Sequence, residues 1–547
     1  MSRGFTEDEI ELIPSAAWSS VRHTDGAVDP ESSAQDTTVG GTSEHQPLSG
    51  WKLAAVIASV TFVVLLMYLD TSIVSTAVPR ITDEFHSLDD IGWYISVYQL
   101  ASAAFQPLSG KIYTKINIKW AFLAFFAVFE AGSAVCGAAR SSAMFISGRA
   151  VAGMGAAGLM NGSLTIVANS VPLNRRPSIT GLIMGVGQLG IAGGPLIGGA
   201  LTEYSTWRWC FYLNLPIGLV AAVGLCAVDI PDPVPKLLTR SFLWRIHDEL
   251  DLVGFALFAP SAAMFLLALQ GGGSGTWAWK SATVIGLFYG SGATFVFWLL
   301  WNWRKGKEAL FPVHLIKERS VWSSAITGSF SLCALFLAAY FLPIYFQAIK
   351  GTSPFMSGVS ILPSILSQLV FAGMSGIAVE RTGFVTPYLG ASAVFLLLSN
   401  GLFSTLGSKT PVSLWATFQV LNGIGRGIGL QMPALVLQAG NPTHMSMSLG
   451  FLIFLQFFSS SIVMAAANII FYQGLRSKLA VDAPNVNAMQ IIAAGATGFR
   501  KIVSEADLPG VLAAYSTSLD NVFILGIGVS AVMLFVTMFI PWMDIRH

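Results

Sequence analysis

A long series of apolar segments dominates the sequence after residue 50, and each segment is about as long as a bilayer is thick. A helix needs about 20 predominantly apolar residues to cross the hydrocarbon core. Hydrophobic residues make up 54% of the 547 residues and charged residues 11%, whereas soluble chains carry about 25% charge. The sequence therefore predicts an all-α polytopic membrane protein with 14 spans. The apolar runs are 51–79, 91–110, 119–139, 143–169, 178–200, 207–229, 251–270, 280–303, 320–348, 356–379, 385–406, 411–437, 445–472 and 520–542.

The composition argues against several partners and chemistries. Thirty Lys and Arg residues balance 29 Asp and Glu residues, so there is no basic surplus for nucleic-acid binding. The four cysteines lack paired CxxC spacing, and the seven histidines lie in tails, loops or span ends. Neither a metal nor a redox cofactor is expected. Neither Gly-Lys pair considered, Gly110-Lys111 nor Gly306-Lys307, continues into a nucleotide-binding P-loop.

Two halves of the chain resemble each other at an offset of eight spans. Residues 110–117 after span 2 and 376–383 after span 10 both show a glycine, four residues, a cation and a turn residue. Span 4 combines Arg149 with several glycines, and span 12 combines Arg426 with glycines within 423–429. This offset predicts two six-helix bundles with two inserted spans, an arrangement of repeats typical of transporters. The alternative is a chance resemblance between glycine-rich helices.

The predicted organisation follows from these runs and from the loop charges. Both termini should lie on one side because the span number is even, and Lys and Arg concentrate in the loops after even-numbered spans, so that side is the cytoplasm. The predicted parts are a disordered cytoplasmic tail (1–50), an N-terminal six-helix bundle (51–229), a cytoplasmic linker (230–250), two additional spans (251–303), a cytoplasmic loop (304–319) and a C-terminal six-helix bundle (320–547) with an extracellular loop (473–519).

Three ionisable residues fall inside the spans of the first bundle. At a rise of 1.5 Å per residue, Asp70 and Glu130 lie about 13 Å and Arg149 about 9 Å below the outer ends of their helices. A buried carboxylate can take up a proton, and an arginine, which stays charged, can change the acid's proton affinity by approaching or leaving. The three residues are therefore candidates for proton coupling. A static ion pair that holds the bundle together is the alternative.

Other polar and small residues within the spans suggest further sites. Gly190, Gly194 and Gly198 recur on one face of span 5, where they allow close helix packing, and Pro195 favours a kink. Polar side chains that could line a substrate cavity, or alternatively tie helices together, are Gln99, Gln347, Arg426, Gln431 and Gln456.

With these motifs, essentially the whole chain after residue 50 resembles the 14-span drug:proton antiporters of the major facilitator superfamily, which include fungal multidrug and toxin efflux pumps. The resemblance implies that Asp70 and Arg149 are the proton-linked pair, whereas Glu130 is a candidate from its depth alone. It also implies that the glycine-proline helix, which includes Gly199, seals or rocks the two bundles. The motifs that carry the resemblance are Leu69–Val74 with Ala77–Pro79, the Gly110 loop, Arg149, Gly190–Gly199 and Trp207–Pro216.

The resemblance further implies gating loops after spans 2 and 10. The first loop departs from the family pattern, since Thr114 stands where an acid is usual and Asn117 where a second glycine is usual. The gating residues implied are Gly110, Lys115, Gly376, Glu380, Arg381 and Gly383.

The sequence thus predicts a transporter that exports a hydrophobic or amphipathic small molecule, such as a drug, toxin or secondary metabolite, in exchange for protons. It should need no cofactor beyond the proton gradient and act as a monomer in the lipid bilayer of the plasma membrane, with the vacuolar membrane as the alternative. A proton-coupled importer of a metal chelate remains open on the same fold. A membrane enzyme or a receptor is disfavoured, because the spans lack a clustered catalytic set and the chain lacks a sizeable soluble domain.

Overall fold

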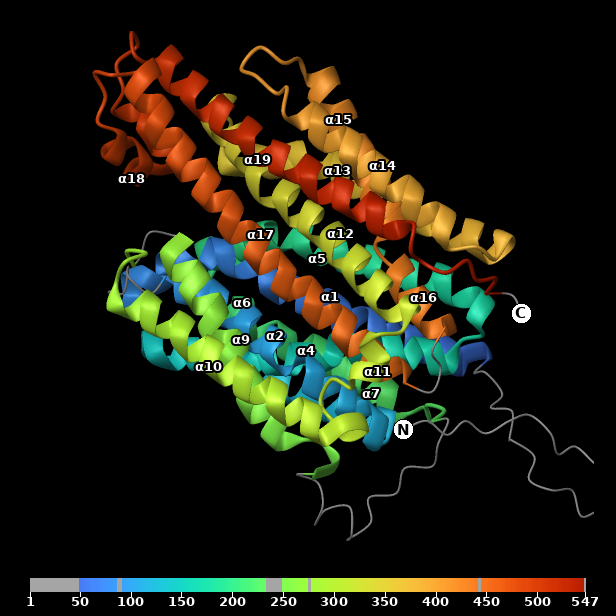
Figure 1. Ribbon diagram of the computed structural model, residues 1–547. Coiled ribbons are helices and arrows are strands. Elements are labelled where there is room, and N and C mark those ends of the chain that lie inside the picture. Colours follow the sequence, from blue (N-terminus) through green and yellow to red (C-terminus); the bar gives the residue numbers. More distant parts are fainter. Residues whose placement is uncertain (1–48, 86–90, 233–247, 274–276, 441–443, 546–547) are drawn as a thin grey trace, which may run out of the picture. The chain divides into compact units, whose positions relative to one another are not determined.

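The computed structural model describes residues 49–85, 91–232, 248–273, 277–440 and 444–545. The tail predicted for residues 1–50 and most of the linker predicted for 230–250 lie outside these residues. Within them the chain is built from α-helices joined by short connections (Figure 1), with one isolated β-bridge between Phe384 and Asp544. The all-α architecture predicted from the sequence is confirmed.

The N-terminal half contains one helical segment for each of its six predicted spans. The sixth segment is divided, because the short α6 is followed directly by α7. The helices are α1 (Gly50–Phe85), α2 (Ile91–Lys115), α3 (Ile118–Gly137), α4 (Ser142–Ser170), α5 (Arg176–Tyr204), α6 (Trp209–Tyr212) and α7 (Asn214–Cys226).

The C-terminal half likewise has a helical segment for each of its predicted spans. The fourth of these is interrupted between Gly429 and Met432, so that it forms two helices. The helices are α12 (Arg319–Ile344), α13 (Pro354–Thr382), α14 (Thr386–Phe403), α15 (Val412–Gly429), α16 (Met432–Gly440), α17 (Met445–Asp482) and α19 (Leu508–Thr537).

Helix ends follow local sequence signals. The Ser141 hydroxyl accepts from the backbone N–H of Met144 at the start of α4, and Ser353 caps α13 in the same way. Pro354 occupies the first turn of α13, where its missing N–H costs no hydrogen bond. Gly383 ends that helix with φ +79°, the left-handed conformation that glycine adopts readily at a helix C-terminus.

Twelve segments of the described chain are long and apolar enough to cross a membrane. Helices α2 and α5, which correspond to the predicted spans 91–110 and 178–200, are 25 and 29 residues long but are not among these twelve. The chain is therefore a multi-pass membrane protein, and the count of 14 spans stays a prediction.

Packing reproduces the eight-span repeat. In the N-terminal half α4 packs against α2 and α3, and in the C-terminal half α15 packs against α13 and α14. The pair α1 and α5 corresponds in the same way to α12 and α17. Between the halves, α2 packs on α17 and α5 on α13, two contacts that exchange under the same offset. The internal repeat is therefore structural.

Two further helices, α9 (Leu252–Gly273) and α10 (Ala282–Lys305), correspond to the predicted additional spans. They lie side by side (Figure 1), and the hydroxyls of Ser261 and Ser291 each donate to the other residue's backbone carbonyl. Helix α9 also contacts both α2 and α17, through edge-to-face contacts of Phe255 with Phe105 and of Phe258 with Phe454. One helix of the additional pair thus bridges the two halves.

The segment 473–519 differs from the predicted loop. Helix α17 continues to Asp482, α18 spans Ala488–Gly498, and α19 begins at Leu508. The predicted helix boundaries followed the apolar runs, which end at residue 472 and begin again at residue 520. Polar residues in the last turns of α17 are compatible with a helix, so the helix continues beyond its apolar run. The side of the membrane on which this segment lies stays a prediction.

Candidate functional site

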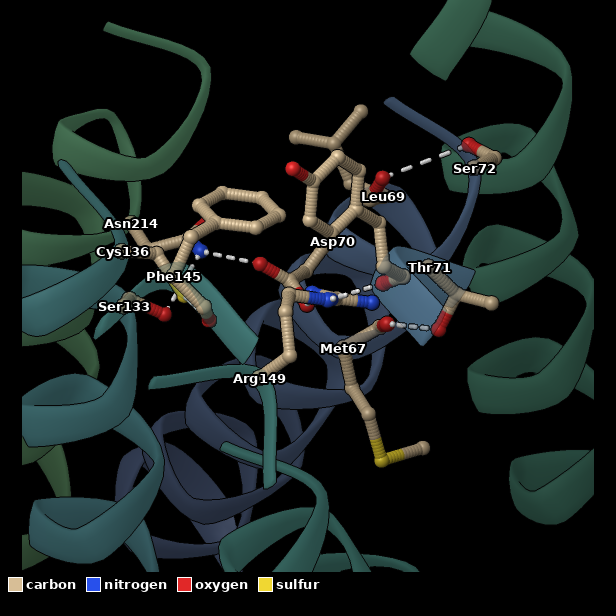
Figure 2. A network of polar contacts seen from close by, with 11 residues as sticks. Met67, Leu69, Asp70, Thr71, Ser72, Ser133, Cys136, Phe145, Arg149 and Asn214 are labelled. Atoms are coloured by element: carbon tan, nitrogen blue, oxygen red, sulfur yellow. Dashed lines mark hydrogen bonds and ion pairs between the residues drawn. The ribbon is translucent and has the colours of Figure 1, made fainter. Parts of the chain in front are cut away.

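A buried ion pair joins the first and fourth helices of the N-terminal half. Arg149 Nη1 of α4 donates to Asp70 Oδ2 of α1 at 2.5 Å, and both side chains are almost completely shielded from solvent (1% and 0% exposed). The sequence predicted these two residues at similar depth, and the structure brings them into contact (Figure 2). Inside a membrane protein such a pair is costly to bury and marks a candidate functional site.

Arg149 is held by more than its carboxylate. Its Nε donates to the backbone carbonyl of Tyr94 in α2 at 3.2 Å, and its guanidinium carbon lies 4.4 Å from the ring centroid of Tyr98. The planar guanidinium thus contacts three groups on two helices at once. Lysine, with a compact ammonium, could not reproduce this geometry.

The second oxygen of Asp70 is bound by an amide that sequence analysis did not single out. Asn214 Nδ2, at the start of α7, donates to Asp70 Oδ1 at 3.1 Å and to Ser133 Oγ of α3 at 3.1 Å. Both Asn214 and Ser133 are completely buried. Helices α1, α3, α4 and α7 therefore meet in one polar network around Asp70, most of which Figure 2 shows.

Glu130, the third predicted candidate, lies outside this network. Its carboxylate packs against Gly218 of α7, one helical turn beyond Asn214. Both carboxylate oxygens are buried and have no hydrogen-bond partner among the described residues. Glu130 is thus close to the ion pair along α3 and α7, but no hydrogen bond joins it to Asp70.

The glycines of span 5 divide by environment. A Cβ atom on Gly190 would lie 2.7 Å from the backbone oxygen of Leu65 in α1, so only glycine allows this approach of α5 to α1. Gly194 is packed as closely against Ser72, whose hydroxyl donates to the Gly190 carbonyl at 3.1 Å. Gly199 faces open space. The Gly198 carbonyl accepts a weak hydrogen bond from Cys210, and α5 runs on through the position of Pro195.

The two halves are joined by side-chain hydrogen bonds at the end that the loop charges predict to be cytoplasmic. Asn161 Nδ2 of α4 donates to the Ser446 carbonyl of α17 at 3.3 Å. The Ser178 hydroxyl of α5 donates to Glu380 of α13 at 2.7 Å, and Gln438 of α16 donates to the Leu164 carbonyl at 3.4 Å. In this conformation the described part of the chain is closed at this end.

Three of the six predicted gating residues, Gly110, Gly376 and Glu380, contact the other half at this end, and most of the six lie on helices rather than in loops. Helix α2 continues through Gly110 to Lys115, and α13 continues through Gly376, Glu380 and Arg381. The prediction of loops was wrong because a helix end rich in charge and glycine can still continue into water. A Cβ on Gly110 would lie 3.0 Å from the Ser446 carbonyl, and one on Gly376 would lie 2.7 Å from Ser178 Cα. Lys115 Nζ forms an exposed ion pair with Glu249 at 2.5 Å.

The residues predicted to line a cavity hold different helix contacts. Gln431 donates to the Ala372 carbonyl at 3.2 Å and Gln456 to the Gly328 carbonyl at 3.4 Å. Arg426 donates to the Ser364 hydroxyl at 3.3 Å, and its Nε has no partner among the described residues. Gln99 of α2 and Gln347, in the π-turn Tyr345–Ile349 after α12, are half-buried. A shared substrate cavity stays a prediction.

Sequence reasoning missed Asn214, Ser133, Tyr94 and Tyr98. Asn214 belongs to the quoted segment Trp207–Pro216, so an uncharged amide within an apolar span was the available signal. Charged residues and glutamines were the polar groups on which the prediction rested, and asparagine was not among them. Serine and tyrosine are common in membrane helices, and the sequence around Ser133, Tyr94 and Tyr98 does not indicate a contact with Arg149 or Asn214.

Comparison with known proteins agrees with this architecture. The profile of the Major Facilitator Superfamily matches residues 60–465. The chain is 50% identical over 519 residues to the MFS-type transporter pigP of Monascus ruber, covering 95% of this chain and 91% of the relative. It is 46% identical over 510 residues to the efflux pump mlcE of Penicillium citrinum, covering 92% of each.

Solved structures show the same fold at low sequence identity. The human organic anion transporter MFSD10 (TETRAN) superposes with a TM-score of 0.54 at 14% identity, over 87% of this chain and 99% of that one. The proton:xylose symporter XylE superposes with a TM-score of 0.55 at 13% identity, over 90% and 96%. The predicted fold class is thereby confirmed, and the chain belongs to the Major Facilitator Superfamily.

Proposed function

We propose that this protein is a secondary transporter that exports a hydrophobic or amphipathic organic molecule, such as a secondary metabolite, in exchange for protons. Export is supported by the relatives whose names describe efflux pumps, among them mlcE and mokI of Monascus pilosus, which is 46% identical over 491 residues. The proton gradient would be the energy source, with no further cofactor, and the plasma membrane the site of action.

The buried pair of Asp70 and Arg149 is the observation that carries proton coupling. Asp70 is completely buried and faces a guanidinium that cannot itself release a proton at physiological pH. The ion pair exists only while the carboxyl group is charged, so a proton on Asp70 would remove the attraction that holds Arg149 in contact. Proton binding or release would therefore accompany a movement of α4 relative to α1.

Helix α4 provides a mechanical link between that proton and the closed end. Arg149 and Asn161 are twelve residues apart on this one helix, which corresponds to about 18 Å. Asn161 contacts Ser446 of the other half at the predicted cytoplasmic end. A shift of α4 that separates Arg149 from Asp70 would also disturb this contact between the halves. Protonation and opening of the closed end would then be coupled through a rigid element.

The full chain, purified and reconstituted in proteoliposomes, tests the proposal under an imposed pH gradient. A panel of hydrophobic fluorescent organic compounds serves as substrate, and a pH-sensitive dye reports proton flux. Counter-movement of protons with at least one compound is expected. Asp70→Asn should abolish gradient-driven transport but retain substrate binding, because the amide resembles the neutral acid and cannot release a proton.

Asp229→Asn is a matched control. Asp229 also pairs with a cation, Lys119, at 3.2 Å, but its side chain is fully exposed. Transport by this variant should equal that of the wild type. Gradient-driven accumulation by Asp70→Asn would contradict the role of Asp70. Proton and substrate movement in the same direction, with a chelate as substrate, would favour an importer on the same fold.

A further inference from the structure

Asn214 has an incomplete hydrogen-bonding pattern in the conformation described above. Both N–H groups of its amide are used, one by Asp70 Oδ1 and one by Ser133 Oγ. Its carbonyl Oδ1 is buried and has no partner among the described residues. A buried acceptor without a partner costs free energy. The unpaired carbonyl oxygen is therefore the feature to be explained.

The two partners of Asn214 share a property that the partners of the buried Asn400 do not share. A carboxylate accepts hydrogen bonds when ionised but donates one when protonated, and a hydroxyl can do either. Asn400 of α14 has the same unpaired Oδ1, but its Nδ2 donates to the Leu396 carbonyl and to Ser530 Oγ. A backbone carbonyl can never donate, so the amide of Asn400 is fixed. Neither partner of Asn214 is a backbone carbonyl, so the amide of Asn214 is not fixed in this way.

Arg149 determines which oxygen of Asp70 can carry a proton while the ion pair is in place. Oδ2 receives the hydrogen bond from Arg149, which has donors only. A proton on Oδ2 would point at another donor. A proton that arrives before the ion pair separates is therefore better placed on Oδ1, where it meets Asn214. In the present orientation of the amide, the N–H of Asn214 would face the O–H of the protonated carboxyl group, and two donors cannot form a hydrogen bond.

Rotation of the amide by 180° about its Cβ–Cγ bond removes this conflict. Asn214 Oδ1 then faces Asp70 and Ser133, accepting from the protonated carboxyl and from the serine hydroxyl. The amide makes two hydrogen bonds in each orientation, and Asn214 itself neither gains nor loses a proton. The two ends of an amide are nearly equal in size, so the rotation requires little extra space.

We propose that Asn214 is a positioning residue whose amide reverses its orientation each time Asp70 changes its protonation state. It donates to the ionised acid and accepts from the protonated one, so that Asp70 keeps a partner throughout the cycle. The inference rests on the proposed function, because it assumes that Asp70 is the acid that titrates. It deepens that function by assigning a role to Asn214 and Ser133.

Infrared difference spectra of the full-length protein in lipid test this proposal without any transport. The protein is prepared with isotopically labelled asparagine, and spectra are recorded across a pH change that protonates Asp70. The carboxyl band of Asp70 should appear, and a labelled amide carbonyl band should shift to lower frequency because that carbonyl gains two hydrogen bonds. Both signals should be absent in Asp70→Asn. The amide signal alone should be absent in Asn214→Leu.

Asn400→Leu is the matched control, and it should retain the labelled amide shift. A carboxyl band without any amide shift would overturn the proposal and leave Asp70 as proton carrier. The absence of both bands from the wild type would overturn the switch and the role of Asp70 together. If Asn214→Leu does not fold, the wild-type and Asp70→Asn spectra still decide. Failure of proton-driven transport in proteoliposomes, with both bands present, would instead contradict the proposed function alone.

Discussion

The carboxylate of Glu130 in α3 lies against Gly218 of α7, in the space that a methyl group on this glycine would occupy. Neither carboxylate oxygen has a hydrogen-bond partner among the described residues, although both are buried. The glycine therefore makes room for an acid that the surrounding residues do not stabilise. The lack of hydrogen-bond partners among the described residues distinguishes Glu130 from Asp70, which has partners on both oxygens.

Replacing Glu130 by leucine should stabilise the protein. The substitution removes a buried polar group without partners, so the free energy of unfolding should rise by about 1–3 kcal/mol, measured by thermal unfolding in detergent. Gradient-driven transport should persist, because Asp70 is the proposed proton carrier. Glu505→Leu, at an exposed acid, is the control and should change stability by less than about 0.5 kcal/mol. Loss of transport by a well-folded Glu130→Leu protein would assign the proton to Glu130.

Arg149→Lys should reduce gradient-driven transport by about tenfold or more, since a hydrogen bond to a charged group contributes about 1.5–3 kcal/mol. Lysine keeps the charge but cannot contact Asp70, the Tyr94 carbonyl and the Tyr98 ring together. Initial rates in proteoliposomes measure the effect. Arg476→Lys, at an exposed position of α17, should transport normally. Wild-type rates in Arg149→Lys would show that charge alone suffices.

Two alanine substitutions in α5 should differ in their effect on stability. Alanine is favoured over glycine in a helix by about 1 kcal/mol, which applies to both positions. At Gly190 the new methyl group would meet the backbone of Leu65 and Leu69 in α1, whereas at Gly199 it would meet nothing within 4 Å. Gly190→Ala should therefore lower the unfolding temperature and Gly199→Ala should leave it unchanged or raise it. Equal behaviour of the two variants would mean that α1 and α5 are not held at this distance.

Gly110→Val should open the end at which the halves are joined. A side chain here meets the Ser446 carbonyl and Met447 Cα, which are backbone atoms of α17. Cys226 is first replaced, so that the thiol reagent does not react with it. A cysteine introduced at Ser446 should then react faster when Gly110→Val is also present. The control is Gly292→Val, since Gly292 of α10 faces open space. An unchanged reaction rate with Gly110→Val would contradict the importance of this contact for closure.

The sequence predicted the helices and the pairing of Asp70 with Arg149 because both depend on simple physical rules. The length of an apolar run identifies a span. Two opposite charges at the same membrane depth lower the free-energy cost of their burial by forming an ion pair. The eight-span offset was readable from Gly110 and Gly376 for a similar reason, since each allows a close backbone approach between the halves.

Other features depend on the rotation of each helix about its axis, which apolar runs do not encode. Span 5 shows that Gly190 faces α1 and Gly199 does not, although both belong to one motif. Asn214 meets Asp70 only because α7 packs against α1 and α3 in one particular rotation. Hydrophobicity does not indicate the helical extension of α17 to Asp482, because helices continue beyond the bilayer.

The additional pair α9 and α10 makes the two sides of an internally symmetric protein unequal. Of the two seams between the halves, the one formed by α2 and α17 is bridged by α9, which contacts both helices through phenylalanine side chains. Any relative movement of the halves must slide these aromatic contacts or carry α9 along with one half. The seam formed by α5 and α13 contains close glycine contacts, such as those of Gly181 and Gly376, and the hydrogen bond from Ser178 to Glu380. A rocking motion of the two halves would therefore be asymmetric, because it would have to break or slide the aromatic contacts of α9 along only one of the two seams.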